Sequence, residues 1–221
     1  MYNNMYIKFG FGGTMSTFLF RNRSINDFLD VLASPASVPG GGAAAGLQGA
    51  QACALAEMVC NFTLTNKKYA SIESDVREVL AKLFSARNEF LSLMDKDSEG
   101  FSKLMEVLQK PKESFPSPSE RTKVLDDAFK LSAAAPTAMS KLCASLVPCF
   151  VFILEKGNKN LLSDALVACK ALTACFFSSV ENIRANVSYV KDKAYVEDVE
   201  SVLKSRISDM NILEDTLNKY V

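Results

Sequence analysis

The stretch "PASVPGGGAAAGLQGAQACALAEMVC", Pro35 to Cys60, is the most informative part of the chain for both fold and function. Three consecutive glycines, Gly40, Gly41 and Gly42, stand directly before a run of Ala, Leu and Met that favours a helix. A glycine-rich loop that opens a helix can bind phosphate through its free backbone N–H groups. No predicted strand precedes these glycines and no Lys-Ser/Thr pair follows them. We therefore interpret the glycines as a helix start without side chains, at which the backbone can approach a ligand or a partner subunit closely. Gly41→Ala should then weaken ligand binding or subunit association.

Length and charge limit the class of protein. The chain has 221 residues, of which 48% are apolar, enough for a substantial core. Lys and Arg together number 25, as do Asp and Glu, so no overall field attracts nucleic acid or an anionic membrane. Uncharged apolar runs are shorter than the roughly 18 residues of a membrane-spanning helix. We expect neither a nucleic-acid partner nor a membrane span.

Cysteine and histidine usage points to the chemistry. The six cysteines lie in apolar runs and form no CxxC motif, so we interpret them as reduced core residues, with a disulfide or a metal role less favoured. Reduced thiols suit a cytoplasmic location. The chain has no histidine, which removes the usual general base and the usual zinc ligand. We expect no metal site, and carboxylates and amides must then handle any proton transfer.

The helical period dominates the chain and predicts an all-α bundle of about six helices. We assign residues 24–221 to this domain and residues 1–23 to an N-terminal extension. The extension holds three cations and no acid, which suits either an organellar presequence or a segment upstream of a start at Met15. The first predicted helix covers 25–33, with Ser24 as its N-cap. The second follows the glycines to about 61–65, and the third covers 71–110. The fourth is capped by Ser119 and ends near 156, and the last two cover 160–190 and 193–219. Pro136 and Pro148 should kink or split the fourth.

One carboxylate of the third helix falls on its apolar side. The stripe consists of Leu80, Leu83, Phe84, Arg87, Phe90, Leu91, Met94, Phe101, Leu104, Met105 and Leu108. Asp97 lies within it, whereas Asp95 and Glu99 fall outside. A partly desolvated Asp97 would have a raised pKa suited to acid/base work. A structural ion pair with Arg87 or with another helix explains the position equally well.

The fifth helix carries Asp164, Asn182 and Asn186 on a face of small residues opposite its main apolar stripe. Asp164 and Asn182 are separated by about 27 Å along a helix that rises 1.5 Å per residue. Either the ligand is long, or two copies of the chain build one site, or these residues are satisfied structural contacts. The small residues of the second helix likewise suggest an oligomer interface, at which Glu57 would make a polar contact.

Taken together, five motifs resemble the cyclodeaminase/cyclohydrolase family, the all-helical domain that forms the C-terminal half of bifunctional formimidoyltransferase-cyclodeaminase and also occurs alone. The motifs are "PGGG" at 39–42, "KKY" at 67–69, "DxDxExF" at 95–101, "GN…SD" at 157–164 and "NxxxN" at 182–186. The resemblance runs from about Ser24 to the C-terminus. It implies cyclodeamination of 5-formiminotetrahydrofolate to 5,10-methenyltetrahydrofolate and ammonia. The alternatives are a methenyltetrahydrofolate cyclohydrolase that gives 10-formyltetrahydrofolate and a non-catalytic folate-binding homologue.

The resemblance also implies the site. Asp97 matches the family's catalytic carboxylate, and Asp164, Asn182 and Asn186 match positions that would orient the pterin or support Asp97. The resemblance implies no cofactor beyond the tetrahydrofolate substrate itself. Anionic polyglutamate tails would meet local cations, for which Lys67, Lys68 and Arg184 are candidates. The family is dimeric, so we expect a homodimer. Ala43 and Gly100 depart from the family's usual Ser and Ala, which leaves altered substrate choice or reduced activity open.

Overall fold

The computed structural model describes residues 19–220, and this part of the chain is helical throughout, without a strand. The all-α prediction is confirmed. The six α-helices between Leu19 and Tyr220 are α1 (Ile25–Leu32), α2 (Gly41–Leu64), α3 (Glu73–Leu108), α4 (Pro118–Lys156), α5 (Leu162–Val187) and α6 (Lys193–Leu217), with short 3₁₀ turns at Phe20–Asn22, Lys67–Ile72, Lys112–Ser114 and Lys159–Leu161.

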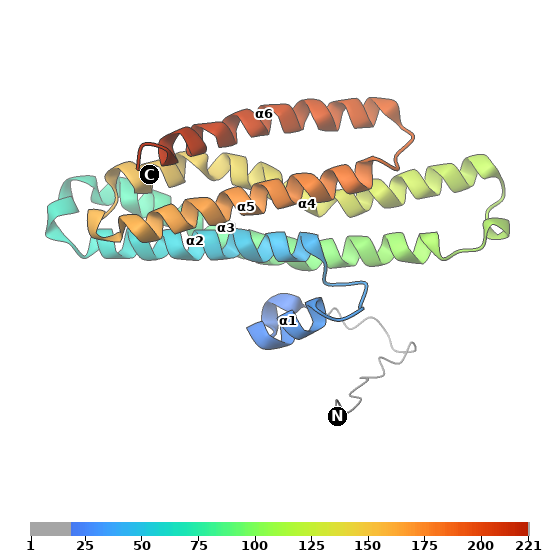
Figure 1. Cartoon of the computed structure of the whole chain (residues 1–221), viewed down its shortest axis with the longest axis horizontal. Helices are drawn as coiled ribbons and strands as arrows, with labels where there is room; N and C mark the ends of the chain where they lie inside the picture. Colours follow the sequence, from blue (N-terminus) through green and yellow to red (C-terminus); the bar gives the residue numbers. More distant parts are fainter. Residues whose placement is uncertain (1–18, 221) are drawn as a thin grey trace.

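Short connections make successive long helices antiparallel neighbours. Helices α2 to α5 form the main bundle, in which α2 contacts α3 and α5, and α4 contacts α3 and α5. Figure 1 shows α6 lying along the side of the bundle opposite α2 and α3, and α1 lying beside the start of α2. The core therefore runs along the whole length of the bundle, and the start of α2 lies next to the end of α5.

Two helix starts test the sequence reading of caps. Ser24 caps α1 as predicted, because its hydroxyl accepts from the Asp27 backbone N–H at 3.1 Å. Helix α4 begins two residues earlier than predicted: Ser117, not Ser119, accepts from the Glu120 N–H at 3.1 Å. Pro118 explains the difference, because its fixed φ suits the first helical position and its missing N–H costs nothing there.

Helix α4 passes through Pro136 and Pro148 without interruption, so the split that the sequence allowed does not occur. Contacts with α3 and α5 on both sides hold the helical path. A proline has no N–H, so the carbonyl four residues earlier loses its intrahelical donor. For Pro136 this carbonyl belongs to Ser132, which is buried beside the functional cleft described below.

The small residues of α2 are explained within one chain. Its glycines let α3 approach closely: a Cβ at Gly46 would lie 2.9 Å from Met94 Cβ, and one at Gly49 would lie 2.6 Å from the Phe90 ring. Glu57 forms an ion pair with Arg87 of α3 at 2.7 Å, so its polar contact lies within the chain and not at a subunit interface. The buried face of α2 thus gives no argument for an oligomer, and Arg87 is not the partner of Asp97.

The segment before α1 contacts the bundle. Phe20 packs with Phe28, Ala43 and Met94 in a second small core. Arg21 pairs with Asp95 at 3.1 Å, which is why Asp95 is buried although the helical stripe placed it outside. The extension delimited as 1–23 therefore contributes residues to the fold, while the suggested presequence and the start at Met15 lie outside the described residues.

The six cysteines are free and buried, as the sequence predicted. Two helices, α4 and the segment 159–187 that includes α5, are also long and apolar enough to cross a membrane by length and composition. Core helices of a bundle pass the same test, and half of the apolar window in α4 is buried against its neighbours.

Candidate functional site

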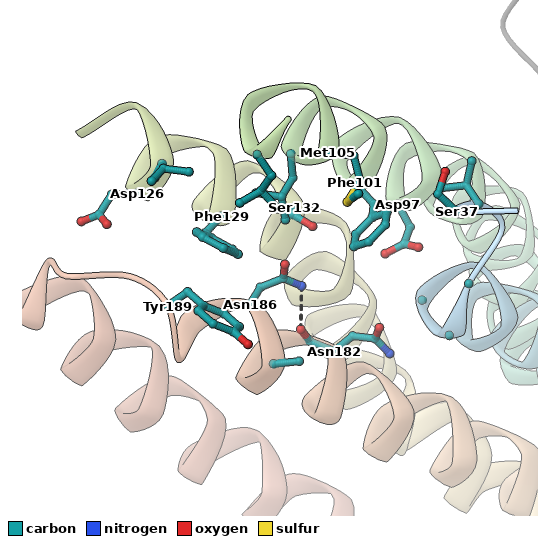
Figure 2. Close-up of a pocket in the computed structure, with 18 of the residues that line it drawn as sticks. Ser37, Asp97, Phe101, Met105, Asp126, Phe129, Ser132, Asn182, Asn186 and Tyr189 are labelled. Atoms are coloured by element: carbon teal, nitrogen blue, oxygen red, sulfur yellow. Dashed lines mark hydrogen bonds between the residues drawn. The ribbon is translucent and has the colours of Figure 1, made fainter. Parts of the chain in front are cut away.

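A cleft of about 790 Å³ opens between α3, α4 and α5 at the start of α2. Figure 2 shows Asp97 and Asp126 at its two ends, with Phe129, Asn186 and Tyr189 between them. The cleft is therefore elongated along the bundle, with a different set of polar groups at each end.

Asp97 occupies the end formed by α2 and α3. Only 9% of the residue is exposed, and the Ala43 backbone N–H donates to its carboxylate. Burial raises the pKa of Asp97 to about 6, an effect that the Ala43 hydrogen bond partly offsets. Near neutral pH this carboxyl can both accept and release a proton, which is what the stripe on the third helix predicted for it.

The glycines explain how a carboxylate reaches this place. Gly40 is the N-cap of α2 and offers no side-chain cap, so the first N–H groups of the helix need another acceptor. Asp97 supplies it from α3, because a Cβ at Gly42 would overlap the Asp97 carboxylate and glycine has none. The positive end of the α2 dipole favours the ionised form. "PGGG" thus makes room for a protein carboxylate where a phosphate loop would hold a phosphate.

Asn182 and Asn186 face Asp97 from α5. The Asn182 side-chain NH₂ donates to the Ser178 carbonyl and that of Asn186 donates to the Asn182 carbonyl, each at 2.8 Å. Each of these bonds uses one of the two N–H donors of its amide, so both amides keep their oxygen and one N–H available to the cleft. Gly41 lies against Asn182, since a Cβ there would sit 3.4 Å from its amide nitrogen. This wall can therefore accept hydrogen bonds from N–H groups of a ligand.

An aromatic pair forms the middle of the cleft, and the sequence analysis missed it. Phe129 of α4 and Tyr189 stack with ring centroids 4.9 Å apart and an interplanar angle of 13°. Tyr189 follows Asn186 by three residues and Asn182 by seven, which is one helical face. Extending the Asn182/Asn186 face by one turn would have found it. The stack offers a flat apolar wall to a planar ligand.

The far end of the cleft is cationic. Arg121 of α4 and Lys191 of the loop after α5 both line it, and neither was predicted. The Asp126 carboxylate binds backbone groups of the same chain. It accepts hydrogen bonds from the Lys191 N–H at 3.0 Å and from the Asp192 N–H at 3.1 Å, and it thereby fixes the loop that leads into α6. The sequence held no signal for these residues, because only the α3–α4 turn and this loop bring them to the cleft.

Of the predicted site residues, the single chain brings together Asp97, the three glycines, Asn182 and Asn186. Asp164, Lys67 and Arg184 do not line this cleft. Asp164 and Lys67 lie toward the other end of α2 and α5, near the contact of Thr63 with the Asn158 N–H at 3.0 Å. Arg184 points away from the cleft and pairs with Glu200 of α6 at 3.6 Å.

Residues 19–220 contain no group of three or more His, Cys, Asp or Glu placed to hold a metal ion. The oxygen atoms that converge in the cleft, those of one carboxylate and two amides, can accept hydrogen bonds from the N–H groups of an organic ligand.

This bundle, with one carboxylate of raised pKa set on a glycine-rich helix start opposite two amide oxygens, defines an all-helical domain of the cyclodeaminase type. The model of the formiminotransferase-cyclodeaminase family matches residues 24–205, and the chain belongs to that family. The resemblance drawn from the five sequence motifs is confirmed.

Several relatives are similar over most of the chain. Methenyltetrahydrofolate cyclohydrolase of Methylorubrum extorquens is 32% identical over 90% of this chain and 96% of its own length. Mouse formimidoyltransferase-cyclodeaminase is 25% identical over 84% of this chain, which spans 34% of the mouse protein. The crystal structure of formiminotetrahydrofolate cyclodeaminase from Thermotoga maritima superposes with a TM-score of 0.82 at 29% identity, covering 90% of this chain and 95% of that one.

Proposed function

We propose that this protein is a folate one-carbon enzyme, a formiminotetrahydrofolate cyclodeaminase that forms 5,10-methenyltetrahydrofolate and ammonia. The observation that carries the proposal is Asp97, a buried carboxyl whose pKa of about 6 lies near physiological pH, at one end of a cleft that can hold an elongated ligand. The relatives named above supply the substrate class.

The reaction requires one proton to move between two nitrogens. N10 attacks the carbon of the protonated formimino group, N5–CH=NH₂⁺, and an N10–C bond forms while the electron pair of the C=N double bond moves to the nitrogen and the proton of N10 passes to the Asp97 carboxylate. Asp97 then gives this proton to the NH₂ of the tetrahedral intermediate. The C–NH₃⁺ bond breaks, ammonia leaves, and the bridging carbon joins N5 to N10 as the methenyl cation. A group with a pKa near the operating pH serves both halves of this transfer.

The rest of the cleft positions the folate. The amide oxygens of Asn182 and Asn186 accept from N–H groups of the pterin, which holds N5 beside Asp97. The bare backbone at Gly40 and Gly41 lets the ring approach the start of α2. Holding N10 and the formimino carbon in attack geometry lowers the barrier further, because the two groups no longer have to find each other.

A second reaction is favoured by the 32% identity to a cyclohydrolase over nearly its whole length. In that reaction water adds to the methenyl carbon and Asp97 takes one proton from it. Asp97 then gives this proton to N5 as the N5–C bond breaks, the hydroxyl proton is released to solvent, and 10-formyltetrahydrofolate results. Both reactions pass through a tetrahedral carbon between N5 and N10, so the same cleft supports either.

An absorbance assay separates the candidates. Methenyltetrahydrofolate absorbance that appears with 5-formiminotetrahydrofolate identifies a cyclodeaminase. Faster decay of added methenyltetrahydrofolate identifies a cyclohydrolase. If neither signal changes although folate binds, the protein is a non-catalytic folate binder and the proposed activity is wrong.

Asp97→Asn tests the mechanism. We expect kcat to fall by about 10²–10⁴-fold, the usual contribution of a positioned acid/base group. Wild-type kcat/KM should fall below a pH of about 6, where Asp97 becomes protonated. Glu99→Gln, an exposed acid on the same helix outside the cleft, is the matched control and should keep full activity. Full activity of Asp97→Asn across this pH range, with folate binding unchanged, would contradict the assignment.

A further inference from the structure

We infer that Arg121 and Lys191 together bind the carboxylates of the glutamate tail of the folate at this end of the cleft. This inference rests on the proposed function, because it places the reactive end of the same ligand at Asp97. It replaces the tail-binding candidates Lys67, Lys68 and Arg184, none of which lines the cleft.

The geometry of the α3–α4 pair sets the distance. A Cβ at Gly100, one turn from Asp97, would lie 3.4 Å from Ser132 Cα, so this part of α4 is level with the reactive end. Arg121 precedes Ser132 by eleven residues, about 16 Å along the helix at 1.5 Å per residue. A folate has a flat pterin and phenyl ring before its glutamate, so its carboxylates lie well away from N10. The Phe129–Tyr189 stack occupies the interval, where a phenyl ring can pack.

The two cations at this end of the cleft, Arg121 and Lys191, are available to bind an anion. None of the ion pairs within the described part of the chain includes Arg121 or Lys191. The nearest acid of the cleft, Asp126, is held by backbone N–H groups, and Lys130 pairs with Asp192 at 2.8 Å. The Arg121 Nε is buried without a hydrogen-bond partner. A buried guanidinium donor without an acceptor is costly, and a carboxylate would satisfy it.

The difference in exposure ranks the two cations by the strength of the contact that each can make. Arg121 is partly buried and stacks its guanidinium over Phe115 at 6.0 Å, whereas Lys191 is exposed at the mouth of the cleft. A guanidinium in a partly dry site makes a stronger, two-pronged contact than an exposed ammonium does. Arg121 should therefore contribute more to the affinity for the tail than Lys191 does.

The test measures dissociation constants for 5-formyltetrahydrofolate, a stable folate, as monoglutamate and as triglutamate by calorimetry. Arg121→Gln should weaken both ligands by about 10-fold, whereas Lys191→Gln should weaken them by only about 3-fold. Arg121→Lys should recover part of the affinity, a result that a merely structural role would not give. Wild-type affinity for the triglutamate should fall as salt rises, and less so in Lys191→Gln.

Lys123→Gln removes the same charge from the exposed side of α4, outside the cleft, and should change neither constant. Unchanged affinities in Arg121→Gln, with the wild type binding and turning over folate, would overturn this inference and leave the proposed function standing. A wild-type protein that binds folate without turnover would refute the activity alone, and the affinities would still decide the inference. A wild type that binds no folate would overturn both.

Discussion

At the scale of the residue, the burial that suits Asp97 to acid/base chemistry also destabilises the folded protein. Burial raises its pKa from 3.8 to about 6, so its ionised form is less favourable in the folded protein than in the unfolded chain. Below pH 3.8 both states are protonated and this penalty is absent. It grows as pH rises toward the folded pKa and is complete above it. The folded state therefore binds more protons within this window, and Asp97 lowers the stability at neutral pH.

Asp97→Asn should consequently be more stable than the wild type at pH 7.5. The shift of about two pKa units corresponds to an increase on the order of 2–3 kcal/mol in the free energy of unfolding. The amide oxygen that this substitution introduces can still accept from the Ala43 N–H. Urea unfolding at pH 7.5 and at pH 4 measures the effect, and the difference between the two proteins should shrink at the lower pH. A constant difference across this range would show that titration of Asp97 is not its cause.

Gly42 should be far more sensitive to alanine than Gly41. A Cβ at Gly42 overlaps the Asp97 carboxylate and must displace it, and a misplacement of about 1 Å can cost about 100-fold in rate. A Cβ at Gly41 only reaches ordinary contact with Asn182, so we expect a smaller effect from Gly41→Ala than from Gly42→Ala.

Steady-state kinetics of the two alanine variants, with far-UV circular dichroism to confirm folding, checks this prediction. Gly42→Ala should lose kcat/KM while staying helical, and Gly41→Ala should remain within a few-fold of the wild type. Equal losses in both variants would mean that the carboxylate is not held by the missing side chain.

At the scale of the element, the start of α4 should depend on Ser117 alone. Ser117→Ala removes the cap of the Glu120 N–H and should cost about 1 kcal/mol, which lowers Tm by about 2–4 °C in a domain of this size. Ser119→Ala is the matched control, because Ser119 lies within the helix and makes no cap. Thermal melts of both variants decide between the two serines, and a larger loss from Ser119→Ala would restore the cap predicted from sequence.

The elements themselves could be predicted because the 3.6-residue period and the Pro and Gly signals are local. Asp97 was found in the same way, since its position on the apolar stripe of α3 is a property of one helix. Phe84 and Leu108 belong to that stripe but are 56% and 44% exposed, because the neighbouring helices do not cover the whole stripe. Periodicity gives the face of a helix and not the extent to which another helix covers it.

The remaining site residues depend on contacts between distant elements. Asp95 is covered by the N-terminal segment, whose Arg21 pairs with it. Arg121 and Lys191 meet in one cleft only because the loop after α5 is fixed to Asp126 of α4. A helical wheel contains no information on such pairs, so the cationic end of the cleft could not be predicted.

At the scale of the whole molecule, we propose a homodimer through the outer face of α2 and α5. The 24 residues of α2 include one charged side chain, Glu57, which Arg87 already neutralises. On α5, Ala174 and Phe177 are exposed beside Ser178, whose hydroxyl contacts Gln48 of α2 at 3.4 Å. The outer face of α2, which carries no unpaired charge, is typical of an interface with a second copy.

Ala54→Glu on the exposed side of α2 should therefore give a monomer, because it places a charge in this face. Light scattering after gel filtration measures the mass of the particle. Ile212→Glu, at an equally exposed apolar position on α6, should leave the dimer intact. A wild-type mass of one chain would contradict the proposed homodimer directly.

The dimer also gives Asp164 a testable role. If the two copies pack α2 and α5 antiparallel, the end of one copy that carries Asp164 lies at the cleft of the other. Asp97→Asn and Asp164→Asn would each inactivate the enzyme alone. Mixed after unfolding and refolding together, they should recover about a quarter of wild-type activity, because half of the dimers carry one intact site. Full activity of Asp164→Asn, or no recovery on mixing, would remove Asp164 from the site.

The Phe129–Tyr189 stack has a spectroscopic consequence. The chain contains no tryptophan and six tyrosines, so its ultraviolet emission comes from tyrosine alone. Tyr189 lines the cleft, and reduced folates absorb where tyrosine emits. A folate packed against this ring should quench its emission by energy transfer, and Tyr189→Phe should keep the stack while lowering the quenched fraction. The protein thus carries its own optical reporter of occupancy, which follows ligand entry without a label.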